Sequence, residues 1–202
     1  MNQYKESQPD HETILLKKGH SGRLRPSVVC VRGVAVKQYK VSGWRKFIAR
    51  RILAREGQIT AELARKGIAP ITLCPSGMLP VSDLKLCLGT ALIPGRHPEG
   101  KVDPHVAQAI LSTLDRIHRL GWTHNDLHRS NFMFIDNDGQ VDVWVLDWAS
   151  AVRPIWPLSL YLRARDRRHV EQMLGMRTGP KPLSSRAWKK IKGLFSPSPA
   201  VS

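Results

Sequence analysis

The chain has 202 residues, 42% of them hydrophobic, which is enough apolar material for a packed core and excludes a chain disordered throughout. Lysine and arginine number 32 against 16 acidic residues, and the formal charge of +16 predicts an anionic partner such as nucleic acid, anionic lipid or a phosphorylated glycan. Cys30, Cys74 and Cys87 lie far apart and form no CxxC pair, so neither a disulfide framework nor a zinc site is indicated.

The first half of the chain predicts a five-stranded antiparallel sheet with helices inserted after the third strand. Residues 14–16 start a strand, and residues 27–31 and 34–39 follow as a hairpin. Residues 78–81 and 86–93 complete the sheet, and the Pro94-Gly95 turn ends this half. Between the third and fourth strands, apolar residues of 43–66 recur at helical spacing, which predicts two helices broken near Gly57 and stopped at Gly67.

The second half predicts mainly helices around one hairpin. A helix begins at Asp103 or Pro104 and runs to Leu120, and another covers residues 158–174. Between them, residues 132–135 and 141–147 form a hairpin across the turn at 137–139. Residues 176–202 are rich in proline, serine and lysine and predict a partly flexible tail.

Two short motifs contain the candidate catalytic and metal-binding residues. The segment His124-Asn125-Asp126-Leu127-His128-Arg129-Ser130-Asn131 is followed, after the hairpin, by Val145-Leu146-Asp147-Trp148. This order and spacing resemble the protein-kinase-like superfamily, whose catalytic loop reads H-x-D-x-x-x-x-N and whose metal-binding Asp ends the next hairpin. Singly, each residue would be an ordinary turn residue or cap. Trp148 stands where protein kinases have Phe, and the Asp-Trp pair is similar to that of aminoglycoside phosphotransferases, which weakens the likeness to protein kinases themselves.

The resemblance implies a role for each motif residue. Asp126 would be the catalytic carboxylate beside the attacking hydroxyl, and Asn131 and Asp147 would hold Mg²⁺ at the phosphates of ATP. His124 would be a structural member of the catalytic loop. In the first half, Val34-Ala35-Val36-Lys37 is similar to the kinase V-A-I-K element, so Lys37 would contact the phosphates.

The partner of Lys37 is left open between two acids of the helical segment. Glu56 is the first candidate for the ion pair, and Glu62 the competitor, although an i,i+4 pair with Lys66 also explains Glu62. The phosphate-covering loop is weakly marked. Gly19, Ser21 and Gly22 would offer backbone N–H groups to phosphate oxygens, or they form a simple β-turn.

In the lengths of the segments between its motifs, the chain is most similar to the lipopolysaccharide kinase family of Gram-negative bacteria. The resemblance implies an α+β, bilobal protein-kinase-like fold, with a small antiparallel five-stranded N-lobe at 14–95 and a reduced, mainly helical C-lobe at 96–175. Residues 1–13 would be a polar N-terminal segment. In that family an Asp in the helix after the metal site braces the catalytic loop, and Asp166 is the candidate here, unless it is merely a solvated Asp among arginines.

The resulting hypothesis is an ATP- and Mg²⁺-dependent kinase that phosphorylates a hydroxyl of a lipopolysaccharide core sugar. The alternatives are a minimal RIO-like Ser/Thr protein kinase and an inactive kinase-like or nucleic-acid-binding module. Residues 1–13 lack the apolar region of a signal peptide, and no stretch approaches the roughly 18 apolar residues of a membrane span. We therefore expect a cytoplasmic protein that meets the cytoplasmic membrane, if at all, at its inner face.

Two basic segments with large apolar residues bear on that membrane contact. The first contains Trp44, Phe47 and Ile48 among arginines and lysines, and the favoured interpretation is a helix packed on the core with a solvated basic face. The second contains Trp188, Ile191 and nearby lysines, for which surface binding and no binding stay equally open.

Overall fold

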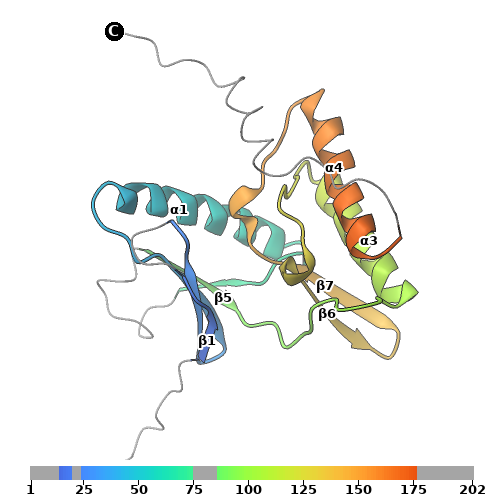
Figure 1. Cartoon of the computed structure of the whole chain (residues 1–202), viewed down its shortest axis with the longest axis horizontal. Helices are drawn as coiled ribbons and strands as arrows, with labels where there is room; N and C mark the ends of the chain where they lie inside the picture. The colour runs from blue at the N-terminus through green and yellow to red at the C-terminus, as the bar shows by residue number, and fades with distance from the viewer. Residues whose placement is uncertain (1–13, 20–23, 75–85, 177–202) are drawn as a thin grey trace, which may run out of the picture.

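The computed structural model describes residues 14–19, 24–74 and 86–176. Its first part is an antiparallel sheet of five strands, as the sequence predicts, and the structure gives their order as β1-β2-β3-β5-β4. One helix, α1, lies across one face of this sheet, and the second part of the chain lies beyond the end of α1 (Figure 1). The strands are β1 (Ile14–Lys17), β2 (Ser27–Val31), β3 (Val34–Gln38), β4 (Thr72–Leu73) and β5 (Cys87–Ala91).

The edge of the sheet differs from the prediction in one strand. Strand β4 is only two residues long and pairs with β5 through Thr72↔Thr90 and Leu73↔Gly89. So short a strand has no alternation of apolar and polar residues that a sequence pattern would reveal. The strand predicted at 78–81 lies outside the described residues.

The helical segment is one helix, α1 (Arg45–Ala64), so the predicted break near Gly57 is wrong. The reason is packing against the sheet. A Cβ atom at position 57 would lie 3.3 Å from Cδ1 of Leu88 on the neighbouring strand β5. Gly57 therefore allows α1 to approach the sheet closely, and this packing outweighs the low helix propensity of glycine.

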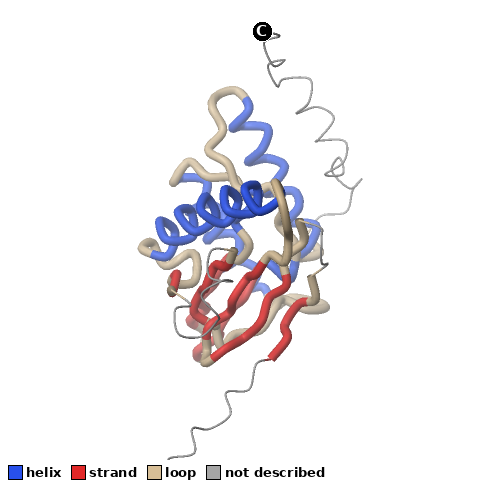
Figure 2. The backbone as a smooth tube through the Cα atoms, turned by 90° about the vertical axis from the view of Figure 1, so that its left-hand side faces the viewer, coloured by secondary structure: helices blue, strands red, loops and turns tan. Residues whose placement is uncertain are grey.

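The second part contains the helices α3 (Pro104–Arg119) and α4 (Leu158–Met173) and a hairpin of β6 (Phe132–Asn137) and β7 (Gln140–Val145). The tube view separates the sheet from the helices above it (Figure 2). Asn137 pairs with Gln140, and Asp138 and Gly139 both have positive φ, of 50° and 94°. These angles are those of a two-residue type I′ turn, so the predicted hairpin is confirmed.

Two hydrophobic cores hold the molecule together, and α1 contributes to both. The smaller core contains Ala49 and Leu53 of α1 with Tyr39 and Val41. The larger core surrounds α3 and the β6–β7 hairpin and takes in Ile59 and Leu63 from the other end of α1. The boundary predicted between 95 and 96 stays a prediction. Within the described part of the chain, no helix is long and apolar enough to cross a bilayer.

Candidate active site

A cavity of about 490 Å³ lies between the five-stranded sheet and the second part of the chain. Its walls are apolar over most of their extent, with side chains from β2, β3 and β5 on one side and Met133 and Leu146 on the other. Charged and amide groups meet in one region of the wall, where Lys17, Lys37, Glu56, Asn131 and Asp147 contribute. The cavity thus joins an apolar slot to a polar, charged region.

Lys37 lies at the centre of this charged region because side chains alternate between the two faces of strand β3. Ala35 and Lys37 line the cavity, whereas Val34 and Val36 are buried. The Lys37 Nζ atom donates to Glu56 Oε1 at 2.7 Å and to Asp147 Oδ1 at 2.7 Å. The predicted ion pair between Lys37 and Glu56 is therefore present, and Asp147 is a second partner.

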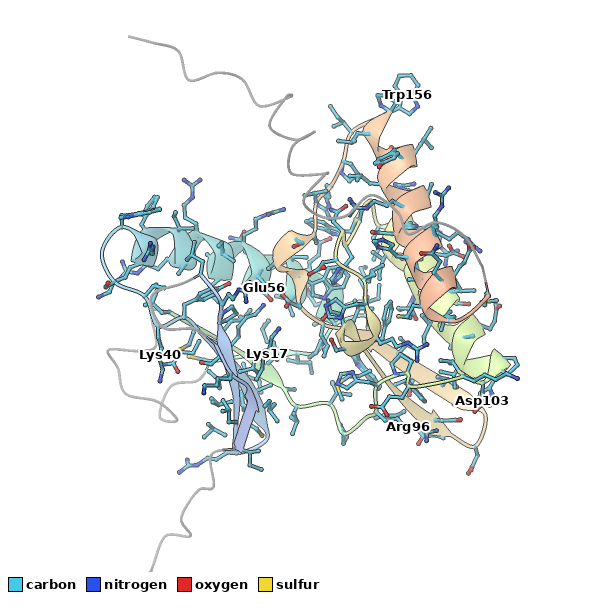
Figure 3. All side chains as sticks on the ribbon, viewed as in Figure 1. Lys17, Lys40, Glu56, Arg96, Asp103 and Trp156 are labelled. Atoms are coloured by element: carbon cyan, nitrogen blue, oxygen red, sulfur yellow. The ribbon has the colours of Figure 1, made fainter. Side chains whose placement is uncertain are left out.

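Glu62 takes no part in this cluster. Its Oε1 atom accepts a hydrogen bond from Trp122 Nε1 at 3.2 Å and pairs with Arg153, on the side of α1 that faces the second part of the chain. Glu56 shares the buried face of α1 with Leu53 and Thr60. Helix geometry decides the choice, because positions 53, 56 and 60 share one face, which meets β3. Figure 3 shows Glu56 pointing from α1 toward the sheet, above Lys17.

Burial and charge act against each other on the pKa values in this cluster. Burial alone would lower the pKa of Lys37, but the carboxylates of Glu56 and Asp147 outweigh it and raise the pKa above the usual lysine range. Burial raises the pKa of Glu56 despite Lys37. For Asp147, burial is again the largest influence and would raise the pKa, yet Lys37 and, more weakly, Lys17 bring it below the usual range.

Asp147 lies two residues after the end of β7, in a left-handed backbone conformation with φ 60° and ψ 67°. This conformation is uncommon for a residue other than glycine, although Asp adopts it more readily than most, and it recurs at functional sites as well as in turns. The next residue, Trp148, is 1% exposed and donates from Nε1 to the Val145 carbonyl at 2.9 Å. The buried indole thus fixes the turn on which the Asp147 carboxylate stands.

Asn131 and Asp126 are joined through the backbone of the catalytic-loop segment. Asn131 Nδ2 donates to the Asp126 carbonyl at 2.8 Å, and Asn131 lines the cavity. Asp126 is exposed and is outside the cavity wall itself. Its carboxylate is therefore accessible to a large molecule that approaches from solvent.

The loop that carries Asp126 is held from α4 by two buried residues. Asp166 accepts from the backbone N–H of His124 at 2.8 Å and of Asn125 at 3.1 Å, so the predicted brace is present. Arg165 donates to the Asn125 carbonyl at 2.9 Å. The peptide groups just before Asp126 are thus fixed on both their N–H and C=O sides, even though Asn125 has a positive φ of 66°.

His124 packs inside the protein and does not line the cavity. Its Nε2 atom donates to the Leu146 carbonyl at 2.9 Å, and its ring lies 4.8 Å from that of Trp148. Burial lowers the pKa of His124 and favours the neutral ring. This geometry fits a structural member of the loop, which links the segment around Asp126 to the strand end that carries Asp147.

Asn131 and Asp147 supply one carboxamide and one carboxylate, both with the hard oxygen donors that Mg²⁺ prefers. Among the described residues, no group of three or more His, Cys, Asp or Glu side chains forms a metal cage. Mg²⁺ usually binds through one or two carboxylates together with water and substrate phosphates, rather than in an all-protein cage. The donor set therefore fits magnesium bound together with a phosphorylated substrate.

Of the three residues predicted to cover the phosphates, Ser21 and Gly22 lie outside the described residues. Gly19 is described, and a Cβ atom there would meet the backbone N of Ser27 at 2.5 Å. Glycine is thus required for the close approach of two backbone segments.

Sequence reasoning missed Lys17, which lines the cavity, and Arg165, for which the adjacent Asp166 was the only available signal.

Solved structures with a similar fold are known, although no protein-family model and no curated protein matches the sequence. The Rio2 kinase of Chaetomium thermophilum in an ADP/Mg²⁺-phosphoaspartate complex superposes with a TM-score of 0.61 at 13% identity, covering 89% of this chain and 62% of that one. A second Rio2 kinase structure from the same organism gives 0.59 at 13% identity, with 89% and 63% covered. The chain spans about three fifths of the length of these kinases. The likeness establishes the predicted α+β, protein-kinase-like fold.

Proposed function

We propose that the protein is a kinase that transfers the γ-phosphoryl group of ATP to a hydroxyl group. The observation that carries the proposal is the triad of Lys37, Glu56 and Asp147 at the charged region of an otherwise apolar cavity. An apolar slot suits a planar base, and the adjoining charges suit a polyphosphate. Rio2 kinase, which has the same fold, has been solved with ADP and Mg²⁺, and this supports a nucleotide in the corresponding place.

Each charged residue has a distinct role in the proposed reaction. Lys37, oriented by Glu56, would contact phosphate oxygens of ATP. Asn131 and Asp147 would hold Mg²⁺, which supplies neutralisation of phosphate charge when bound. Asp126 would orient the acceptor hydroxyl and receive its proton, since its exposed carboxylate stands on a loop fixed by Asp166 and Arg165.

For the acceptor, we propose a sugar hydroxyl of a lipopolysaccharide core at the inner face of the cytoplasmic membrane. Two observations support a large anionic acceptor: the formal charge of +16 and the exposure of Asp126. The chain between Asp147 and α4 is also short, covering only residues 148–157. Such a short connection leaves the approach to Asp126 less covered. The likeness to Rio2 kinases keeps a protein acceptor as the alternative.

The nucleotide part of the proposal is tested by thermal unfolding with ATP and Mg²⁺. Binding to the folded state raises the midpoint of unfolding, and the shift should be lost in Asp147→Asn. Asp142→Asn on β7 is the matched control, because it removes an exposed carboxylate from the same hairpin. Equal shifts in all three proteins, or none in any, would contradict ATP binding at this cavity.

The acceptor is tested with γ-labelled ATP, Mg²⁺ and a Gram-negative envelope extract, after separation of glycolipid from protein. Label in glycolipid that depends on Asp126 supports the sugar kinase. Asp126-dependent label in protein alone supports the RIO-like alternative. Salt-dependent binding of nucleic acid without any ATP turnover would favour the inactive, nucleic-acid-binding alternative.

A further inference from the structure

The start of α1 carries large aromatic side chains on the protein surface. Trp44 is 70% exposed and Phe47 is 63% exposed. The favoured sequence interpretation, a helix whose large apolar residues pack on the core, is therefore wrong for these two residues. The core-facing side of α1 is formed instead by Ala49, Leu53 and residues further along the helix.

Basic residues are the sequence neighbours of the two aromatic residues. We name the whole set the basic-aromatic patch, which consists of Lys40, Trp44, Arg45, Lys46, Phe47, Arg50 and Arg51. All seven are exposed, and Arg45 and Arg51 lie over the Trp44 and Phe47 rings at 5.8 and 5.6 Å from the centroids. Figure 3 shows Lys40 below the start of α1, at the end of the helix away from α3 and α4.

The segment that contains the patch is free of acidic residues. The sequence from Lys40 to Arg55 contains none, and the first turn of α1 therefore has none. Acidic side chains would stabilise the start of a helix, where the macrodipole is positive. The patch instead adds cations to that positive end, an arrangement that is unfavourable for the isolated protein and favourable for contact with an anionic surface.

We propose that the basic-aromatic patch is a docking surface for an anionic phospholipid bilayer. Exposed Trp and Phe at the headgroup boundary, with Lys and Arg beside them, is the pattern of helices that lie on membranes. The complementarity of charge supplies the long-range attraction, and the two rings supply apolar area. This inference does not rest on the proposed phosphoryl transfer.

The observations favour a bilayer over nucleic acid. The patch lies at the exposed start of α1 and just before it, and none of its residues lines the cavity beside Lys37. Proteins that bind single strands combine a charged groove with free ring faces for the bases. Here an arginine lies over each ring, and an extended outer surface suits a broad, flat partner.

The test is flotation of the full-length protein with vesicles. Vesicles of phosphatidylglycerol and phosphatidylcholine in equal parts should carry the protein upward, and phosphatidylcholine alone should not. Phe47→Ser should weaken binding several-fold, whereas Ile71→Ser should not, although the two side chains are nearly equally exposed at 63% and 64%. The full chain is used for every variant, so residues 177–202 are the same in each.

A second pair of variants separates the patch from overall charge. Arg45→Gln with Lys46→Gln should weaken binding by roughly 25-fold, whereas Lys101→Gln with Arg119→Gln removes the same charge elsewhere and should weaken it far less. Equal weakening by both pairs, or wild-type binding by the patch variants, would overturn the proposal. Patch-dependent binding to a single-stranded oligonucleotide, with no vesicle binding, would overturn it in favour of nucleic acid. Unchanged thermal unfolding of the variants excludes misfolding as the cause.

Discussion

The Lys37 Nζ atom on β3 lies 2.7 Å from Asp147 Oδ1 beyond β7, across the boundary between the sheet and the second part of the chain. The same atom also contacts Glu56 on α1, so one ammonium group joins three elements. Removing it would leave two carboxylates close together in a largely buried place. This relationship sets the first prediction.

Replacing Lys37 by Met should abolish most ATP-dependent activity, with a loss of about 10²–10³-fold, because a charged donor to phosphate is lost. It should also destabilise the fold by about 3 kcal/mol, since Glu56 keeps a buried, unpaired carboxylate. The double variant Lys37→Met with Glu56→Gln should recover much of the stability and none of the activity. Urea unfolding and turnover assays measure the two effects, and recovery of activity would contradict the role of Lys37.

Glu56 and Glu62 lie on the same helix, so substitutions of the two can be compared directly. Glu56→Gln should lower activity because its side chain orients Lys37 in the cavity. Glu62→Gln should leave activity unchanged and cost less than about 1 kcal/mol, because its pair with Arg153 is partly open to solvent. Steady-state kinetics of the two variants, side by side, would expose a wrong assignment if Glu62→Gln were the more damaging change.

Asp166→Ala should reduce both stability and turnover, because two buried N–H groups, of His124 and Asn125, would lose their acceptor. We expect a loss of about 2–4 kcal/mol in the free energy of unfolding. Asp115→Asn is the control, as its pair with Arg167 is exposed and should matter little. At a temperature where the variant is still folded, turnover should fall more than ATP affinity, since the loop positions Asp126 and not the nucleotide.

Stability should decrease as the pH falls below the ordinary histidine pKa of about 6.5. Burial lowers the pKa of His124, so in that range the unfolded chain binds a proton that the folded protein does not. Among the described residues, its Nδ1 atom has no hydrogen-bond partner to receive such a proton. The loss should approach about 1.4 kcal/mol per pH unit for this group.

The burial-raised pKa of Glu56 acts in the opposite direction at lower pH, so the measurement belongs between pH 5.5 and 7.5, roughly around the histidine value. His169, whose pKa burial also lowers, adds to the slope. Denaturant unfolding of the wild type and of His124→Gln isolates the contribution of His124. An identical pH dependence in both proteins would rule this contribution out.

Gly57→Ala tests how α1 packs on β5 at the position where the sequence predicted a break. Alanine favours a helix interior by about 1 kcal/mol over glycine, and the new Cβ would meet only the end of the flexible Leu88 side chain, at 3.3 Å. We expect a small net gain in stability. Leu88 also lines the cavity, so a displaced Leu88 should weaken nucleotide binding. A clear loss of stability measured by urea unfolding would show that Leu88 cannot move away from the new Cβ atom.

The sequence predicted the site best where the functional residues lie close together along the chain. Asp126, Asn131 and Asp147 lie on one loop and the hairpin that follows it, so their spacing along the chain is close to their arrangement in space. The contact of Lys37 with Asp147 spans 110 positions, and no prediction from the sequence included it. The hydrogen bond of Arg165 to Asn125 likewise joins distant segments, and its only signal in the sequence is the neighbouring Asp166.

The errors have physical causes that a sequence pattern does not contain. Glycine usually interrupts helices, but at position 57 the helix continues because α1 packs closely on Leu88 of β5. Apolar residues usually face the core, but Trp44 and Phe47 precede the part of α1 that has a sheet to pack against. In both cases the tertiary surroundings, and not the local preference, decide the outcome.

Because α1 is a single uninterrupted helix of 20 residues, it is a rigid rod roughly 30 Å long. One end is exposed with Trp44, the middle carries Glu56, and the other end is anchored in the larger core by Leu63. Ala49 and Leu53 hold the first half of the rod in the smaller core, so the helix is anchored on both sides of Glu56. The ion pair with Lys37 thus lies between two fixed points of a stiff element, and α1 ties the two cores together at the place where Lys37 is oriented.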